Sequence, residues 1–218
     1  MYFITFEGID QSGKSTQLDL LAAAAAKAGI DTLSVREPGG TPLGEQIREL
    51  LLGPEHTTMD AWTEALLYAA ARVQLVKEVI KPALMQGKIV LSDRYIDSSL
   101  VYQGMARELG VDRILDLNLG ATGGLMPDLT FVFHLDVVAS RERLAGRGTA
   151  EDRIEGEPLD FHQKVEDGYR KLEEMYPGRI VGIDGGRALE EVHADVVAAC
   201  SERLGLKLRE TGSGSQVI

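Results

Sequence analysis

Short apolar runs alternate along the chain with longer segments in which apolar residues recur every three or four positions. The short runs predict strands at residues 2–7, 31–37, 88–93, 128–136 and 179–184. The longer segments predict helices at residues 14–28, 42–53 and 60–86, a helix that ends near residue 109, and helices at 138–146, 159–176 and 188–204. Pro82 lies inside the third of these helices and predicts a kink or a break near residue 81.

This alternation predicts an α/β fold with a five-stranded parallel sheet and helices on both of its faces. Ligands of such sheets bind at the carboxyl ends of the strands. The chain has no internal repeat and no linker that would divide it, so we expect one domain over residues 1–208. Residues 209–218 are polar and rich in Gly and Ser, and we expect this tail to be disordered.

Composition narrows the choice of partners. The net charge is −11, and a surface of this sign repels nucleic acid polymers and anionic lipid, so we expect neither as a partner. An anionic substrate would need a local arginine cluster.

The single cysteine, Cys200, excludes an internal disulfide and lies in a helical pattern, where a buried residue without a chemical role is expected. MYFITFEG has no basic start and is too short for a targeting segment, so we expect a cytoplasmic protein.

A phosphate-binding loop follows the first strand. GIDQSGKS, residues 8–15, matches G-x-x-x-x-G-K-[ST] and lies between a predicted buried strand and a predicted helix, which is the context that this motif requires. Its glycines allow backbone N–H groups to turn toward phosphate oxygens, and the following helix adds its positive N-terminus. Lys14 would reach the β- and γ-phosphates of a nucleotide, and the Ser15 hydroxyl would hold Mg²⁺.

A second acidic residue should complete the magnesium site. Two predicted strands lead into an aspartate, IVLSD with Asp93 and FVFHLD with Asp136. Asp93 precedes Arg94 at a strand's carboxyl end, and we prefer it as the acid beside the metal. Asp136 is expected to be a helix N-cap or a turn residue.

Three classes of protein use such a loop: switches, motors and phosphoryl transferases. A GTPase switch would need an N-K-x-D tetrapeptide, which does not occur, and a motor would usually need a larger chain. The polar segment at 146–157 lies beside or contains Arg141, Arg143, Arg147 and Arg153, as a short mobile lid that neutralises a transferring phosphoryl group would require. A solvated charged loop is the alternative, because Glu151, Asp152 and Glu155 are present too.

The acceptor side is less clear from residue spacing. Tyr68 and Arg72 are four residues apart and share a helix face, where they could stack on and hydrogen-bond to a planar base. They could equally be a core tyrosine beside a surface arginine. Tyr102 and Gln103 are similarly ambiguous.

At this point the motifs resemble a known family. FEGIDQSGKSTQ, VREPGGTPLGEQIRELLL, EALLYAAARVQLV, LSDRYIDSSLVYQG and DRIE occur in this order and at this spacing in bacterial-type thymidylate kinases. The resemblance runs from residue 2 to about residue 205. It implies the three-layer fold of P-loop NTPases and transfer of the ATP γ-phosphoryl group to dTMP, with Mg²⁺, in a homodimer.

The resemblance also implies roles for individual residues. The ATP phosphates would be held by Gly8, Ile9, Asp10, Gln11, Ser12, Gly13, Lys14, Ser15 and Thr16. Asp10 would face the acceptor. Catalysis would involve Lys14, Asp10, Arg94, Arg147 and Arg153, with Arg147 also stacked on adenine. The loop after Asp184 would close over the adenine. The metal would lie by Ser15 and Asp93. dTMP would be held by Glu37, Arg48, Tyr68, Arg72, Arg94, Ser98, Ser99, Tyr102 and Gln103, with Tyr68 on thymine, Arg72 at the base edge and Tyr102 under the deoxyribose.

The chain departs from the family at three positions. Gln11 stands where some members have an arginine and bacterial members commonly a glycine; being neutral, it leaves the catalytic cation to Arg147 or Arg153. Tyr68 replaces a common phenylalanine. His134 lies in a strand and is expected to be a neutral core histidine. His56, His162 and His193 are scattered, so no zinc site is expected.

Two rival functions stay open. A nucleoside kinase would need a carboxylate to take a proton from a hydroxyl acceptor, and Glu37 could serve. A nucleotide-dependent switch would hydrolyse ATP slowly and transfer nothing to a monophosphate. The two arginines expected at the acceptor phosphate favour a monophosphate kinase.

Overall fold

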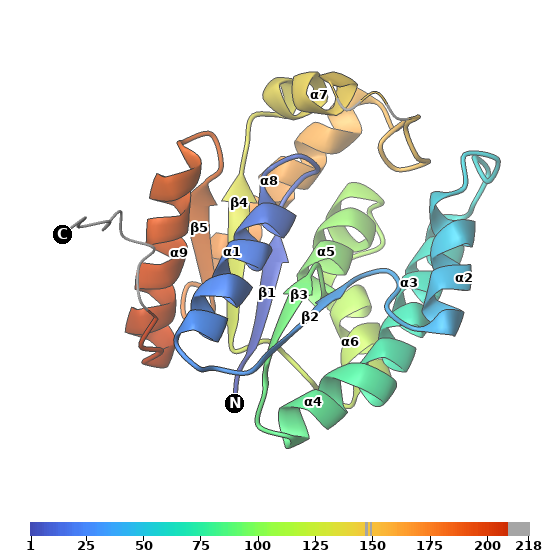
Figure 1. The fold of residues 1–218 in the computed structure, drawn as a ribbon. Coiled ribbons are helices and arrows are strands. Elements are labelled where there is room, and N and C mark those ends of the chain that lie inside the picture. Colours follow the sequence, from blue (N-terminus) through green and yellow to red (C-terminus); the bar gives the residue numbers. More distant parts are fainter. Residues whose placement is uncertain (147, 149, 209–218) are drawn as a thin grey trace.

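The computed structural model describes residues 1–146, 148 and 150–208. Five parallel strands form one sheet in the order β2-β3-β1-β4-β5 (Figure 1). The strands are β1 (Phe3–Glu7), β2 (Thr32–Arg36), β3 (Ile89–Asp93), β4 (Leu129–His134) and β5 (Ile180–Asp184). The predicted parallel sheet is confirmed, and every strand ends within two residues of its predicted bounds.

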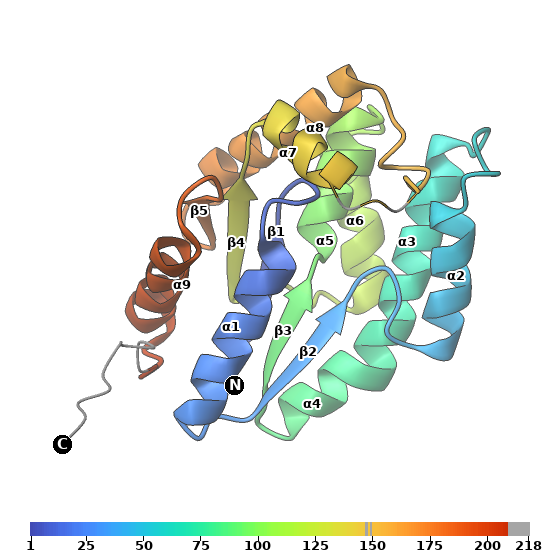
Figure 2. The same cartoon turned by 45° about the horizontal axis from the view of Figure 1, so that its top comes forward.

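Helices cover both faces of the sheet, as predicted (Figure 2). One face is covered by α1 (Lys14–Lys27) and α9 (Leu189–Leu204). The other is covered by α3 (Ala61–Leu75), α5 (Ile96–Ser99), α6 (Val111–Thr122) and α8 (Leu159–Met175). The remaining helices are α2 (Pro42–Leu52), which packs on α3, α4 (Lys81–Met85) and α7 (Val137–Gly146).

The period of two along each strand divides the core into two layers. Ile4 and Phe6 of β1 pack with Phe131 of β4 on the side of α1 and α9. Phe3 points to the opposite face, where its ring meets Tyr95 edge to face at 4.8 Å. The central strands β1, β3 and β4 are buried on both faces and largely apolar, which is why they were visible in the sequence, whereas the edge strand β2 is only partly buried.

Helix α6 is absent from the predicted elements, which leave residues 110–127 unassigned. Its buried face carries Ile114, Asn118 and Thr122, spaced four residues apart. Two of these three positions, Asn118 and Thr122, are polar. Asn118 accepts a hydrogen bond from a buried arginine of α3. The apolar repeat that identifies most helices is therefore interrupted, although the helix is well packed.

The helix does not break at residue 81, the break that Pro82 allowed; a π-helical turn lies just before it. This turn spans Val76–Ile80 and joins α3 to α4, with right-handed helical backbone on both sides. A second π-helical segment, Leu100–Ala106, continues α5. An extra residue in a helical turn is one of the ordinary causes of a helix irregularity.

His134, at the carboxyl end of β4, was expected to be a neutral core residue, but it is half-buried and lies between two carboxylates. Its Nδ1 lies 3.0 Å from Glu166 Oε1 and its Nε2 lies 2.8 Å from Glu173 Oε2. Burial opposes protonation of the ring, but the two carboxylates outweigh it and raise the pKa of His134. By contrast, Asp136 does act as an N-cap, accepting from the backbone N–H of Val138 and Ala139.

Cys200 is fully buried in α9, as expected, and burial raises the pKa of its thiol to about 12. Within residues 1–146, 148 and 150–208, no helix has the length and apolar character needed to cross a bilayer. The predicted tail at 209–218 lies outside the described residues, as do Arg147 and Thr149.

Candidate active site

The loop between β1 and α1 curls at the carboxyl edge of the sheet. Gly8 and Gly13 have φ of 131° and 97°, and Gln11 also lies in the left-handed region at 60°. A Cβ at Gly8 would collide with the carbonyl oxygen of Phe133, so β4 leaves room only for glycine there. The loop backbone is thereby held against the sheet, and the N-terminus of α1 opens toward the space above it.

Lys14 begins α1 and is buried under this loop, where its Nζ donates to the Ile9 carbonyl oxygen at 2.7 Å. Burial and the nearby Arg94 together lower the pKa of Lys14 to about 8, against the opposite effect of Asp10 and Asp93. A bound phosphate would stabilise the charged form of Lys14, because its negative charge would offset the cost of burying the ammonium.

Ser15 and Asp93 meet at the ends of α1 and β3. The Ser15 hydroxyl donates to Asp93 Oδ2 at 2.5 Å. Their side chains come from segments 78 residues apart in sequence, yet they form the pair of oxygen donors predicted for Mg²⁺. A P-loop magnesium ion takes its other ligands from phosphate and water, and these two residues fit that donor set. No cluster of three or more His, Cys, Asp or Glu side chains suited to a metal occurs in the described part of the chain.

Arg94 links the phosphate loop to the neighbouring pocket. Its Nη2 contacts Asp10 Oδ1 at 2.6 Å, and its Nη1 donates to the Gly8 carbonyl oxygen at 3.0 Å. Burial opposes the ionisation of Asp10, but Arg94 and Lys14 outweigh it and lower the pKa of this carboxyl. Arg94 has a φ of 71°, which directs its side chain back over the loop, and its guanidinium lies 5.4 Å from the centre of the Tyr102 ring.

A buried carboxylate supports Arg94 from behind. Glu7, the last residue of β1, accepts from Ser98 Oγ at 2.5 Å, from Tyr169 Oη at 3.0 Å and from the backbone N–H of Tyr95 at 2.7 Å. Ser98 and Tyr169 in turn both lie within hydrogen-bonding distance of Arg94 Nη1. Burial raises the pKa of Glu7 to about 7, with a further contribution from Asp97.

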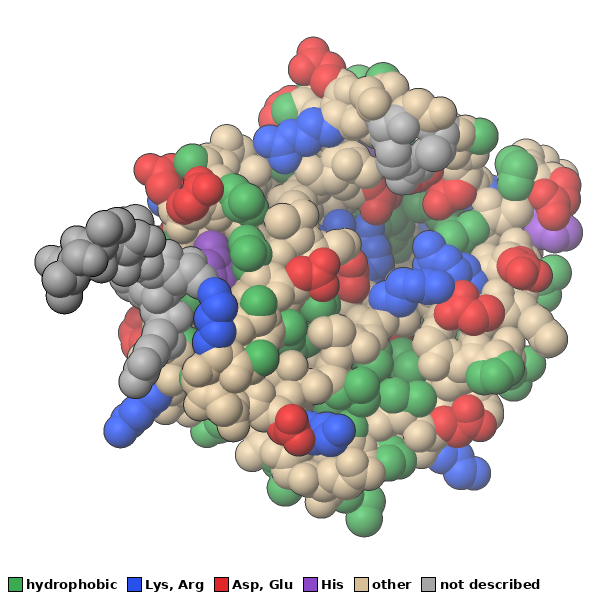
Figure 3. All heavy atoms as spheres, viewed as in Figure 1, with side chains coloured by type: hydrophobic (Ala, Val, Ile, Leu, Met, Phe, Trp, Pro, Cys, Tyr) green, Lys and Arg blue, Asp and Glu red, His purple; other side chains and the backbone are tan. Residues whose placement is uncertain are grey.

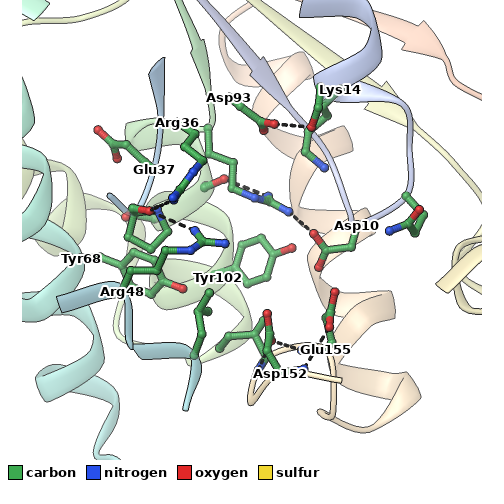
Figure 4. Close-up of a pocket in the computed structure, with 18 of the residues that line it drawn as sticks. Asp10, Lys14, Arg36, Glu37, Arg48, Tyr68, Asp93, Tyr102, Asp152 and Glu155 are labelled. Atoms are coloured by element: carbon green, nitrogen blue, oxygen red, sulfur yellow. Dashed lines mark hydrogen bonds and ion pairs between the residues drawn. The ribbon is translucent and has the colours of Figure 1, made fainter. Parts of the chain in front are cut away.

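A cavity of about 480 Å³ opens between the phosphate loop and the helices α2 and α3 (Figures 3 and 4). Lys and Arg side chains gather at its mouth in the space-filling view. In the close-up, Asp10 and Lys14 lie across the cavity from Arg48 and Tyr68, with Tyr102 between them and Asp152 and Glu155 at one end.

Most predicted site residues line this cavity together. They are Asp10, Gln11, Lys14, Ser15, Glu37, Arg48, Tyr68, Asp93, Arg94, Ser98, Ser99, Tyr102 and Gln103. Gly8, Ile9, Ser12, Gly13 and Thr16 form the phosphate loop and the start of α1. Arg147 lies outside the described residues, so the structure gives it no position.

Arg72 is neither a surface residue nor part of the cavity lining among the residues that the structure describes. It is 1% exposed and lies behind the wall of the cavity. Its Nε donates to Glu37 Oε2 at 2.7 Å, and its other nitrogens donate to Ser99 Oγ, Asn118 Oδ1 and the Tyr95 carbonyl oxygen. The interpretation as a surface arginine is therefore wrong, and direct contact of Arg72 with a base stays a prediction.

Arg153 is held against α2 and α3. Its Nη1 donates to Glu64 Oε2 at 2.7 Å, and its Nε donates to the Leu51 carbonyl oxygen at 2.7 Å. A different arginine approaches the phosphate loop, since Arg143 Nη1 donates to the Gln11 carbonyl oxygen at 3.0 Å. A role for Arg153 at the transferring phosphoryl group remains a prediction.

Sequence reasoning missed three contributors to the site. Arg36, at the end of β2, lines the cavity and, like Arg48, donates to the Pro38 carbonyl oxygen. Burial lowers the pKa of Arg48, and the neighbouring Arg36 lowers it further. Asp152 also lines the cavity. Glu7 lies in the core behind the cavity, where it accepts from the lining residue Ser98. Arg36 sits at a strand's carboxyl end, which is the signal that could have identified it.

Two buried polar atoms of the cavity residues have no hydrogen-bond partner within the described part of the chain. They are Glu37 Oε1 and the Tyr102 hydroxyl. Burying an unpaired polar atom costs free energy, so such atoms in a cavity indicate where a polar ligand would bind. The cavity thus offers arginines for an anion, an aromatic wall and two unpaired polar atoms.

Comparison with known proteins decides the family. A family model described as thymidylate kinase matches residues 6–196. The chain belongs to the thymidylate kinase family. It is 47% identical over 205 residues to a thymidylate kinase of Lactobacillus helveticus, covering 93% of this chain and 97% of that one. It is 48% identical over 202 residues to a thymidylate kinase of Exiguobacterium sp., covering 93% and 95%.

A solved structure of thymidylate kinase from Ehrlichia chaffeensis shares the fold, with a TM-score of 0.73 and 34% identity over 91% of this chain and 97% of that one. The predicted thymidylate kinase family and the predicted P-loop fold are therefore both confirmed, and the chain is an enzyme of this family.

Proposed function

We propose that the protein transfers the γ-phosphoryl group of ATP to dTMP, giving dTDP and ADP, with Mg²⁺. One observation carries the proposal: the phosphate loop and the arginine-lined cavity share a single edge of the sheet, and Arg94 joins them through Asp10. A donor phosphate on the loop and an acceptor phosphate in the cavity would then face each other across this ion pair.

On the donor side, the loop backbone and Lys14 would hold the ATP phosphates. Ser15 and Asp93 would hold Mg²⁺, which would neutralise part of the charge on the donor phosphates. The pKa of Lys14, lowered by burial to about 8, would rise when phosphate binds, so that the ammonium is fully charged in the complex.

On the acceptor side, Arg36, Arg48 and Arg94 would hold the dTMP phosphate. The charge of Arg36 lowers the pKa of Arg48, and a phosphate bound by both would relieve their repulsion. Tyr68 would stack on thymine, and Ser99 and Gln103 line the same cavity. Tyr102 would lie under the deoxyribose, where its hydroxyl would disfavour a 2′-hydroxyl.

The reaction needs no strong general base, because a phosphate monoester is largely dianionic near neutral pH. An oxygen of the acceptor phosphate would attack the γ-phosphorus as the bond to the β–γ bridging oxygen breaks, leaving ADP. The protein's main tasks are to bring two anions together and to exclude water, which limits ATP hydrolysis.

We further infer a lid-arginine mechanism, because Gln11 is neutral and supplies no cation at the loop tip. Arg143 supports this proposal, since its guanidinium already reaches the carbonyl oxygen of Gln11. Arg147 and Arg153 were the arginines expected from the sequence. Arg153 would have to leave Glu64 to reach the phosphoryl group, so Arg143 is the better candidate among the lid-side arginines that the structure describes.

A homodimer in the cytoplasm is part of the proposal. Large apolar side chains are exposed on α2 and α3, which pack against each other: Leu43, Leu50, Trp62 and Leu66. A second copy of the chain would cover such a face. Sedimentation velocity tests this, and a monomer at micromolar concentration would contradict it.

The reaction is tested by coupled ADP release with ATP and Mg²⁺ over dTMP, dUMP, UMP, CMP, AMP, GMP and thymidine. We expect a strong preference for dTMP. Turnover of thymidine in place of dTMP would identify a nucleoside kinase. Slow ATP hydrolysis without transfer to any acceptor would favour a nucleotide-dependent switch.

A further inference from the structure

One buried carboxylate, Glu64, joins the lid segment to the acceptor side of the cavity. Glu64 lies in the first turn of α3 and is 1% exposed. Its two oxygens accept from three side chains, two from the π-helical segment and its C-cap and one from the lid segment. They are Gln103, Arg107 and Arg153. These four residues, with Glu157, are called the Glu64 cluster below.

Two members of the cluster belong to the lid segment. Arg153 Nη1 lies 2.7 Å from Glu64 Oε2, and the Arg153 side chain is 6% exposed. Glu157 is joined indirectly, because Arg107 Nη2 contacts Glu157 Oε1 at 2.5 Å and Glu64 Oε2 at 3.2 Å. The neighbouring Ile154 is buried and lines the cavity, so this part of the lid segment forms one of its walls.

The same arginine also fastens the lid segment to α2. Arg153 Nε donates to the Leu51 carbonyl oxygen at 2.7 Å, and its backbone N–H donates to the Leu52 carbonyl oxygen at 3.1 Å. These carbonyls lie in the last turn of α2, where a cation is favoured by the helix dipole. Because α2 carries Arg48, Arg153 holds together two helices that contribute to the acceptor pocket.

On its other side the cluster touches the pocket itself. Gln103 lines the cavity, and its Nε2 donates to Glu64 Oε1 at 2.8 Å. Tyr68, which also lines the cavity, lies four residues after Glu64 on the same face of α3. A molecule that orders Gln103 and Tyr68 therefore orders the carboxylate that binds Arg153.

We propose that Glu64 is a positioning residue that couples acceptor binding to closure of the lid segment through its ion pair with Arg153. This inference rests on the proposed function. It gives Arg153 the role of holding the lid segment closed, here called the latch, instead of a contact with the transferring phosphoryl group. Moving the lid segment away would leave the buried carboxylate with one guanidinium in place of two. Closure is favoured for that reason.

Coupling of this kind is reciprocal. If dTMP favours the closed lid by a given factor, the closed lid tightens dTMP binding by the same factor, and factors of about 5 to 150 are typical. Loss of the Glu64–Arg153 pair should therefore weaken acceptor binding even though neither residue lies in the cavity lining among the described residues.

Steady-state kinetics of the full chain provide the first test. Glu64→Gln keeps the shape and the hydrogen bond from Gln103 but removes the charge. We expect its KM for dTMP to rise about tenfold or more, with a smaller change in the KM for ATP and more ATP hydrolysed per dTDP formed. The matched control is Glu151→Gln, which removes a half-exposed lid carboxylate that pairs only with Arg141 among the contacts the structure gives it, and should change neither value more than twofold.

Limited trypsin digestion supplies a readout besides activity. Trypsin must draw the Arg153 side chain into its own pocket, so cleavage after Arg153 reports release from Glu64. dTMP should slow this cleavage in the wild type and much less in Glu64→Gln. Arg153→Lys, which keeps the charge, should retain part of the dTMP affinity that Arg153→Gln loses. Thermal unfolding shows which variants are folded. If Glu64→Gln is not folded, the Arg153 variants test the ion pair in its place.

The latch is overturned if Glu64→Gln binds dTMP as the wild type does, or if dTMP protects Arg153 equally in both. It is also overturned if Glu64→Gln and Glu151→Gln raise the KM for dTMP equally. A wild type that transfers nothing to dTMP would instead overturn the proposed function, so the two failures are distinguishable.

Discussion

The buried pair of Arg72 and Glu37 gives the sharpest stability prediction. Arg72 lies 2.7 Å from Glu37 Oε2, and their side chains are 1% and 3% exposed. Arg72→Met fills a similar volume but leaves the Glu37 carboxylate buried without a cation. It also removes the donor to Ser99, Asn118 and the Tyr95 carbonyl oxygen. We expect severe destabilisation even though no apolar core residue changes.

Removing one partner of a buried ion pair costs about 3–5 kcal/mol. For a chain of this length each kcal/mol lowers Tm by about 2–4 °C, so Tm should fall by about 6–20 °C. Arg113→Met, at an exposed position, is the control and should change the free energy of unfolding by less than about 0.5 kcal/mol.

Urea unfolding measures these values, with Glu37→Gln and the double variant completing a cycle. The double variant should be more stable than the sum of the two single changes by about 1–3 kcal/mol, because it leaves no buried charge unpaired. A loss below about 1 kcal/mol in Arg72→Met, or simple additivity, would refute the argument that this pair is a mutually dependent part of the core.

The pH dependence of the same variant has a definite sign. Burial raises the pKa of Glu37 in the folded protein, and Arg72 opposes that shift. Without Arg72 the folded pKa should rise further above its unfolded value, so the folded state binds the extra proton and gains stability as pH falls. The deficit of Arg72→Met should therefore be smaller at pH 5 than at pH 8.

Three further predictions concern the phosphate loop and the sheet edge. Gln11→Gly should keep turnover within about threefold if the catalytic cation comes from the lid, and a thousandfold loss would contradict the lid-arginine mechanism. Asp93→Asn should raise the Mg²⁺ concentration for half-maximal rate at least about tenfold with little change in Tm, and an unchanged Mg²⁺ titration would exclude Asp93 from the metal site. Carboxylates raise the pKa of His134, so its stabilisation is complete below the unfolded value of about 6.5 and is lost as pH rises through the folded pKa. The Tm advantage of the wild type over His134→Gln should therefore be largest near pH 6 and shrink toward pH 9, and a constant difference would show that no charge is involved.

The sequence by itself determined the sheet and the position of the phosphate loop. Strands buried on both faces must be apolar at nearly every position, and the phosphate loop is a local motif whose residues are neighbours in sequence. Asp93 could be chosen before the fold was known, because a carboxylate at a parallel strand's carboxyl end must lie at the ligand-binding edge. Its contact with Ser15 confirmed that neighbourhood.

Only the tertiary structure decided the long-range polar contacts. Helix α6 was missed because its buried positions include Asn118, whose polarity makes sense only beside Arg72 of another helix. His134 was misjudged because its two carboxylate partners lie on α8, 32 and 39 residues away.

The partners of Glu64 illustrate the same limit. Gln103, Arg107 and Arg153 follow it by 39, 43 and 89 residues. Apolar periodicity records which face of an element is buried, because burial acts on every residue of that face. It does not record which charges meet inside, because each such pairing depends on one contact made by the whole fold.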